Sequence, residues 1–217
     1  MIKIDKVDVF GWQAAMRGMR NPMNSWSKSD SAWVVGEYPE PINPNGFLEF
    51  QLGPNDIDLA MRLAKAGSVH AKYRRMIVVQ CDILAPLYWW KEFDTYKVGT
   101  VSNSCSTMHK IHAKEFTLDD FSHERLMTGG IECIRNLCVD LNLCREKYLE
   151  TKDKEWWWQM IQLLPSSYNQ LRTVQMSYEV LAGMYRDRKN HKLDEWRDFC
   201  GMIECLPYSD LITIGGE

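Results

Sequence analysis

The sequence predicts one soluble domain that mixes β-strands with α-helices, and three observations support this. Residues 1–9 alternate apolar and charged side chains, as a half-buried strand does. Residues 76–83 are rich in β-branched side chains, which is typical of a central strand. Most of the second half instead has apolar residues at helical spacing. A chain of 217 residues can bury one substantial core, so we expect a single domain over residues 1–217.

The segment between these two strands is expected to contain two helices. The first is a short helix over residues 10–19. Residues 37–46 contain several prolines and are expected to form an irregular connection that is too short for an interdomain linker. The second helix is expected to begin at Pro54, where Asn55 and Asp56 supply capping side chains, and to end at Gly67.

An aromatic helix is expected directly after the central strand, over residues 85–93. It runs into residues 95–106, which we expect to form a loop rich in hydroxyl and amide side chains. Proteins that combine strands and helices commonly build sites for polar ligands from such loops. We therefore interpret residues 85–106 as the active-site region.

The second half is expected to be helical. Apolar residues at helical spacing occur over residues 131–147, and a tryptophan run at 156–158 leads into another apolar segment. A polar, strongly basic turn covers residues 186–192, and a last helix is expected over residues 193–206 before Pro207 stops it. Between them, a long helix is expected to start at Pro165-Ser166-Ser167 and to run through Leu171, Val174, Tyr178, Leu181 and Met184.

Charge and cysteine content exclude several classes of protein. The net charge of −3 gives no general attraction to nucleic acid or to an anionic membrane, and we expect neither as a partner. Seven cysteines without a Cys-x-x-Cys pair argue against a disulfide framework or a zinc ribbon. Reduced thiols, the absence of a signal-peptide pattern and the absence of a membrane-spanning window predict a cytoplasmic protein. His109 and His112 lack acidic or thiolate partners at compatible spacing, so we expect no metal.

Two parts of the chain contain a characteristic order of landmarks. These are a basic-flanked His70, a strand, Ala85-Pro86, an aromatic helix and the loop over 95–106, then Leu164-Pro165, a long helix, Arg186, Arg188, His191 and Trp196. This order resembles the signature region of the flavin-dependent thymidylate synthases, and the resemblance covers residues 60–110 and 160–200, roughly half the chain. The resemblance implies an α+β fold, in which helices pack around a twisted, mostly antiparallel sheet, and a homotetramer with flavin sites at subunit junctions.

The loop departs from the family pattern at most of its charged positions. The Arg-His-Arg triplet of the family falls on Thr95-Tyr96-Lys97, so only Lys97 keeps a positive charge. The Asn-Glu pair falls on Ser102-Asn103, and the following Ser and Arg fall on Cys105 and Thr107. The Gln that reads the pyrimidine in the family falls on Glu92.

The resemblance implies flavin-dependent methylation of a pyrimidine deoxynucleotide monophosphate, of the dUMP to dTMP type. FAD would be the flavin, methylenetetrahydrofolate the one-carbon donor and NADPH the reductant. By this resemblance the flavin-contacting residues are His70, Lys72, Lys97, Ser102 and Asn103. Glu92, Cys105 and Ser106 would recognise the pyrimidine, and Cys105 and Ser106 are also the candidate catalytic positions. Arg186 and Arg188 would bind the phosphate.

Each of these residues also has a simpler interpretation. His70 and its neighbours Lys72, Arg74 and Arg75 could be a helix end with solvated charges. The basic turn at 186–192 could likewise be a solvated helix terminus. Cys105 could be a nucleophile with a lowered pKa, or a small residue in place of Ser. The tryptophan runs could stack on a base, or they could be core and subunit contacts.

The loss of the arginine triplet leaves a second function open. A member that does not catalyse the reaction, or that acts on another substrate, would keep the scaffold and bind a nucleotide or flavin. An ionised Glu92 accepts hydrogen bonds but cannot donate them, which suits the amino group of a deoxycytidine nucleotide. A nucleic-acid-binding module is disfavoured because the chain has no long basic stripe.

Overall fold

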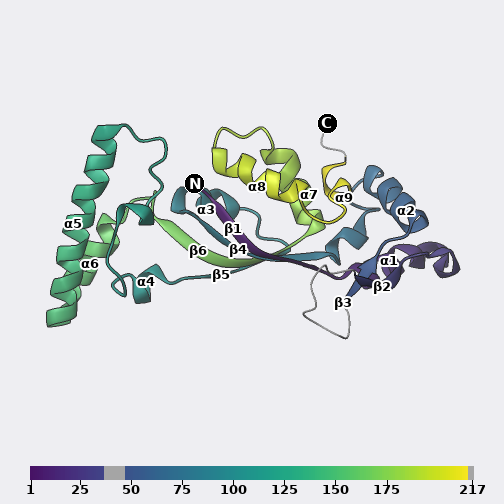
Figure 1. Cartoon of the computed structure of the whole chain (residues 1–217), viewed down its shortest axis with the longest axis horizontal. Coiled ribbons are helices and arrows are strands. Elements are labelled where there is room, and N and C mark those ends of the chain that lie inside the picture. Colours follow the sequence, from purple (N-terminus) through teal and green to yellow (C-terminus); the bar gives the residue numbers. More distant parts are fainter. Residues whose placement is uncertain (37–46, 215–217) are drawn as a thin grey trace.

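A computed structural model describes residues 1–36 and 47–214, and its centre is an antiparallel sheet with the strand order β1-β4-β6-β5. Figure 1 shows this sheet as a long, twisted ribbon that runs along the molecule. The predicted α+β fold with a mostly antiparallel sheet is therefore confirmed. The proline-containing segment 37–46 lies outside the described residues. The four strands are β1 (Lys3–Phe10), β4 (Val78–Pro86), β5 (Thr100–Ser104) and β6 (Asn169–Ser177).

Helices α3, α7 and α8 cover one face of the central sheet, while α1, α2 and α9 pack at one end of it (Figure 1). A two-stranded sheet, β2-β3, lies at the same end, and α5 and α6 form an antiparallel hairpin at the other end. The bounds are α1 (Trp12–Arg20), β2 (Ala32–Gly36), β3 (Phe47–Gln51), α2 (Pro54–Lys65), α3 (Leu87–Phe93), α4 (Thr107–Lys110), α5 (Thr128–Thr151), α6 (Lys154–Leu163), α7 (Tyr178–Arg188), α8 (Asp194–Glu204) and α9 (Asp210–Thr213). Short 3-10 turns cover Asn21–Met23, Trp26–Lys28, η3 (Lys72–Arg75) and Leu118–Asp120.

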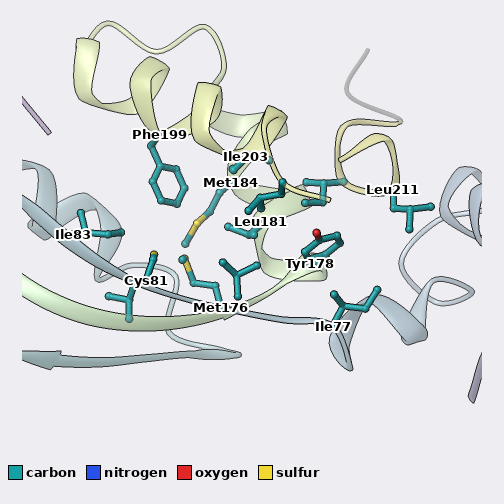
Figure 2. Close-up of a cluster of buried hydrophobic side chains, with 14 of the residues drawn as sticks. Ile77, Cys81, Ile83, Met176, Tyr178, Leu181, Met184, Phe199, Ile203 and Leu211 are labelled. Carbon is teal, nitrogen blue, oxygen red and sulfur yellow. The ribbon is translucent and has the colours of Figure 1, made fainter. Parts of the chain in front are cut away.

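The main core lies between the sheet and the helices that cover it. Figure 2 shows side chains of β4 and β6 pointing toward those of α7 and α8. Each large apolar side chain buried in such a layer contributes about 1.5–3 kcal/mol through removal from water. The labelled members are Ile77, Cys81, Ile83, Met176, Tyr178, Leu181, Met184, Phe199, Ile203 and Leu211, and all are buried.

The tryptophan runs divide between the core and the surface. Trp89 and Trp90 of α3 are buried at 0% and 1% exposure, which confirms the interpretation of this pair as core. Trp158 of α6 is 43% exposed. The α5–α6 hairpin has a smaller core of its own. Because there are two cores, the single domain expected over residues 1–217 stays a prediction. The hairpin core contains Ile111, Phe116, Phe121, Cys138, Leu141, Cys144 and Met160.

The long helix predicted from Pro165 is wrong over residues 169–177, which form strand β6. Leu171, Val174 and Tyr178 have helical spacing, but burial in this segment follows the two-residue period of a strand at Val174 and Met176. Strand β6 pairs with β4 on one side and β5 on the other, so pairing between distant segments outweighs the local helical pattern. The helix begins only at Tyr178, where the Ser177 hydroxyl accepts a hydrogen bond from the Val180 amide.

The basic segment predicted as a turn over residues 186–192 is helical through Arg188, the last residue of α7. Seven other predicted elements are confirmed, with shifts of a few residues at their ends. These are the strands at 1–9 and 76–83 and the helices that correspond to α1, α2, α3, α5 and α8. Among the described residues, no helix has the length and apolar character needed to cross a membrane.

Candidate functional site

Part of the predicted loop is an exposed edge strand. Residues 100–104 form β5, which pairs with β6, and no described strand pairs with its outer edge. The turn before it requires Gly99, because its φ is +80° and a Cβ there would lie 2.9 Å from Val180 Cγ2. Lys97 on this turn is exposed, as are residues 101–105. The candidate site therefore contains a strip of accessible polar side chains along β5.

Two residues predicted to contact flavin lie next to each other on β5 and therefore point to opposite faces of the sheet. Ser102 is paired with Val174, which is buried under the helices, and Asn103 is paired with Thr173 on the uncovered face. Successive side chains alternate across a strand. Ser102 and Asn103 consequently cannot both contact a planar ring from the same face.

Glu92, at the end of α3, is surrounded by hydrogen-bond donors. Its Oε2 accepts from Arg188 Nη1 at 2.6 Å and from Trp196 Nε1 at 2.9 Å, and His191 Nε2 lies 3.5 Å away. Arg188 also donates to the Tyr96 hydroxyl at 2.9 Å, and its guanidinium lies 4.7 Å from the Trp196 ring centroid. We refer to Glu92, Tyr96, Arg188, His191 and Trp196 as the Glu92 cluster.

The structure thus brings two of the predicted substrate-binding residues together, but they are bound to each other. Arg188 neutralises Glu92, so neither charge is open to a ligand while the pair is closed. Arg186 behaves differently: it is exposed, and its one ion pair within the described part of the chain is with the adjacent Asp187. Arg186 therefore remains accessible to a phosphate. The substrate-binding roles of Glu92, Arg186 and Arg188 stay predictions.

Arg172 of β6 is a candidate residue that the sequence analysis missed. Its Nη1 donates to Asp94 Oδ1 at 2.7 Å and its Nε to Gln170 Oε1 at 2.9 Å, while its guanidinium lies 4.2 Å from the Trp90 ring centroid. Gln170 in turn donates to the Cys105 carbonyl at 2.9 Å. This chain of contacts, the Arg172 network, joins α3, β6 and the end of β5. The helical spacing of Leu171, Val174 and Tyr178 hid Arg172, because only pairing with β4 and β5 makes this segment a strand.

The two candidate catalytic positions have different surroundings. Cys105 is exposed, and its backbone amide donates to the Leu171 carbonyl at 2.9 Å. Neither Lys97 nor Lys110 makes a hydrogen bond or ion pair with the Cys105 thiol in the described part of the chain. Ser106 caps α4, because its hydroxyl accepts a hydrogen bond from the His109 amide at 3.0 Å. Ser106 therefore has a structural partner already.

His70 and Lys72 lie on the exposed turn and 3-10 helix that follow α2. Within the described residues, no hydrogen bond or ion pair joins either side chain to the strip on β5. The interpretation of solvated basic neighbours is wrong for Arg74, which is 5% exposed. Arg74 pairs with Glu179 at 2.7 Å and donates to the Leu211 carbonyl at 3.0 Å, so it is structural.

A cleft of about 990 Å³ opens beside Tyr88 and Glu195. Tyr88 lies one turn before Glu92 on α3, and its hydroxyl donates to Glu195. Burial and the Glu195 carboxylate raise the pKa of Tyr88, which keeps its hydroxyl protonated. Two cations in its wall, Arg125 and Arg197, both pair with Asp194. Among the described residues, no group of three or more His, Cys, Asp or Glu side chains is placed to hold a metal.

Comparison with known proteins identifies the fold. No protein-family model matches the chain, and no curated protein matches it. A structure of thymidylate synthase X (ThyX) from Helicobacter pylori with FAD and dUMP superposes with a TM-score of 0.65 over 98% of each chain, at 13% sequence identity. A second structure of flavin-dependent thymidylate synthase ThyX from the same organism, complexed with FAD and dUMP, gives a TM-score of 0.64 at 14% identity over 96% of this chain and 98% of that chain. The chain therefore has the fold of the flavin-dependent thymidylate synthases.

Proposed function

We propose that this chain binds a flavin and a pyrimidine deoxynucleotide monophosphate and uses them for flavin-dependent methylation of the dUMP to dTMP type. The observation that carries the proposal is the shared fold over nearly the whole of both chains, with Helicobacter pylori ThyX in complex with FAD and dUMP. The exposed strip on β5 supports it, since it places accessible polar groups on the strand that follows α3 in the chain. Methylenetetrahydrofolate as the one-carbon donor and NADPH as the reductant complete the proposal.

The residues on the strip fit the polar parts of a flavin nucleotide. Lys97 is exposed and has no carboxylate partner among the described residues, so its ammonium is open to a phosphate oxygen. Asn103, on the uncovered face of the sheet, offers an amide group that suits ring carbonyls and nitrogens, whereas Ser102 points to the opposite face and would contact a different part of the cofactor. A bound flavin supplies the hydride chemistry, and the chain's own task is to orient it and to exclude water.

Assembly into a homotetramer is part of the same proposal. In one subunit the strip on β5 is an open surface. In addition, no described helix covers one face of the central sheet (Figure 1). Leu171 and Val101 on that face are 40% and 62% exposed. A second subunit that covers this face would close the site, and the molar mass in solution, measured by light scattering, tests this part.

A second candidate function is binding of the nucleotide or flavin without turnover, and the Glu92 cluster favours it. The arginine that the resemblance assigns to substrate phosphate is engaged by an internal carboxylate. A carboxylate that already accepts hydrogen bonds from two donors also has less capacity to accept them from the amino group of a deoxycytidine nucleotide. An active enzyme would therefore have to break the Glu92–Arg188 ion pair, so that Arg188 can bind the substrate phosphate. A protein in which this pair stays closed would be a binding protein.

The absorbance spectrum of the protein as purified tests the proposal first. We expect the bands of an oxidised flavin, either at once or after addition of FAD, and thermal stabilisation by FAD and by dUMP. Incubation with reduced flavin, methylenetetrahydrofolate and either dUMP or dCMP, followed by mass spectrometry of the nucleotide, then separates the candidates. A methylated product supports the enzyme, binding without product supports the second candidate, and a colourless protein that FAD does not stabilise contradicts both.

A further inference from the structure

A second cavity is lined by residues of α4, of the segment after it and of the α5–α6 hairpin. The hairpin lies at the end of the molecule away from α1 and α2 (Figure 1). Its volume is about 340 Å³, which suits one small molecule. The wall comes from three separate parts of the chain and is mostly aromatic. The lining residues are Met108, His109, His112, Tyr148, Lys154 and Trp157. We call it the hairpin cavity.

The aromatic rings of the hairpin cavity are held in place by contacts of their own. Trp157 Nε1 donates to the Met108 carbonyl at 3.0 Å, which ties α6 to α4. The His112 ring packs edge-on against Tyr148, with ring centroids 4.8 Å apart. Rings that are fixed before a ligand arrives lose little conformational entropy on binding. The walls are therefore suited to a planar, apolar ligand body.

The electrostatic environment of the hairpin cavity is positive. Burial is the main factor that lowers the pKa of His112, and the positive charges of Lys110, Lys152 and Arg145 lower it further. Its imidazole is therefore neutral near pH 7. None of these three cations, nor Lys154 in the wall, pairs with a carboxylate of the described residues. A ligand with one negative charge would meet unneutralised cations there.

One polar atom in the wall has no partner. His112 Nδ1 is buried and makes no hydrogen bond within the described chain. A buried polar atom without a partner costs about 1–3 kcal/mol, and a shift of the ring that brought Nδ1 to a ligand oxygen would recover part of this cost. The cavity thus combines aromatic walls, a single lining lysine and an unsatisfied imidazole nitrogen.

We propose that the hairpin cavity is a binding site for a small aromatic carboxylate. The aromatic ring of the ligand would pack against Trp157 and Tyr148, and its carboxylate would face Lys154 and His112. A monoanion is preferred because Lys154 is the one permanently charged residue in this wall. This site is separate from the strip on β5 and does not depend on the function proposed above.

Calorimetric titration of the full chain with benzoate tests the proposal. We expect saturable binding of benzoate, and binding of the uncharged isostere benzamide that is weaker by about tenfold or more, because the charge is lost. Acetate should bind more weakly than benzoate, because it lacks the ring. Lys154→Gln should reduce benzoate affinity by a similar factor, and Trp157→Leu should reduce affinity for both benzoate and benzamide.

Matched controls lie on the same hairpin. Lys147→Gln removes an exposed lysine outside the cavity, and Trp158→Leu removes the neighbouring, more exposed tryptophan. Both should bind benzoate as the unmodified protein does. NMR spectra of the histidine rings provide a second readout, since benzoate should shift the His112 resonances. Equal affinity for benzoate and benzamide, unchanged binding in Lys154→Gln, or no saturable binding by a folded protein would overturn the proposal.

Discussion

Arg188 Nη1 lies 2.6 Å from Glu92 Oε2, although 96 positions separate these residues in the chain. Trp196 donates to the same carboxylate oxygen, so the end of α7 and the start of α8 are both tied to the end of α3. The resemblance assigns Glu92 to the base and Arg188 to the phosphate of one substrate. In the free chain each satisfies the charge of the other, which makes this pair the most informative place to change the molecule.

Glu92→Gln should release Arg188. The amide keeps a hydrogen-bond acceptor for Trp196 but removes the charge that holds the guanidinium, so we expect dUMP affinity to rise by up to about tenfold. The stability cost should be small, about 1 kcal/mol, because the pair is partly exposed to solvent. Calorimetric titration with dUMP measures the gain. The double variant Glu92→Gln/Arg188→Gln should lose it, and an unchanged affinity in the single variant would show that Arg188 does not reach the nucleotide.

Arg172→Gln should disorganise the strip on β5. The change removes the Asp94 ion pair and the contact with the Trp90 ring, and we expect a loss of about 1–2 kcal/mol in the free energy of unfolding. FAD binding should weaken as well, since the Arg172 network supports the backbone at Cys105 through Gln170. Urea unfolding and a FAD titration measure the two effects. Arg186→Gln, which removes an exposed arginine, is the matched control, and an equal loss of stability there would refute the assignment.

Cys105→Ser separates the two interpretations of this thiol. Because a hydride from flavin requires no enzyme nucleophile, we expect methylation to continue at a rate within about tenfold of the unmodified protein. Among the described residues, no lysine makes a hydrogen bond with the Cys105 thiol. Product formation measured by mass spectrometry is the test. Abolished turnover with FAD binding retained would instead identify Cys105 as the nucleophile.

Acid should destabilise the protein partly through Asp56, which is fully buried against Arg20. Burial opposes ionisation of Asp56, but hydrogen bonds from Ser29, Ser31 and Arg20 outweigh it, and the net effect lowers the pKa of Asp56. Its stabilisation is therefore present above the unfolded-state pKa of about 3.9 and is lost as pH falls through the lower folded-state value.

Asp56→Asn should lower the free energy of unfolding at pH 7 by about 3–5 kcal/mol, since it leaves Arg20 buried without a counter-charge. Below pH 4 the difference between the variant and the unmodified protein should shrink. Urea unfolding at several pH values provides the measurement. A difference that stays constant down to the lowest accessible pH would show that Asp56 is not ionised in the folded state.

Local sequence signals predicted the elements whose stability is local or whose backbone is paired at both edges. The β-branched run at 76–83 became β4, which is hydrogen-bonded on both sides. The helix from Pro54 to Gly67 became α2, with proline in its first turn and Gly67 at a φ of +98° beyond its end. Such signals act within a few residues, so they can be read without knowing the rest of the fold.

Local sequence signals did not predict strand β6 or the Glu92 cluster. The spacing of Leu171, Val174 and Tyr178 matches a helix, and only pairing with β4 and β5 selects the strand. The error hid Arg172, because a residue placed on a helix would not have been expected beside β5. The bond between Glu92 and Arg188 was equally hidden, since each residue has a reasonable role of its own until the chain brings them together.

The sequence by itself determined the α+β character, the central strand β4, the aromatic helix α3 and the polar composition of the segment that follows it. Tertiary structure decided that this segment is an edge strand, that Ser102 and Asn103 face opposite sides, and that Glu92 and Arg188 bind each other. The physical reason is that propensity and capping are properties of neighbouring residues, whereas strand pairing and charge neutralisation depend on which distant segments meet.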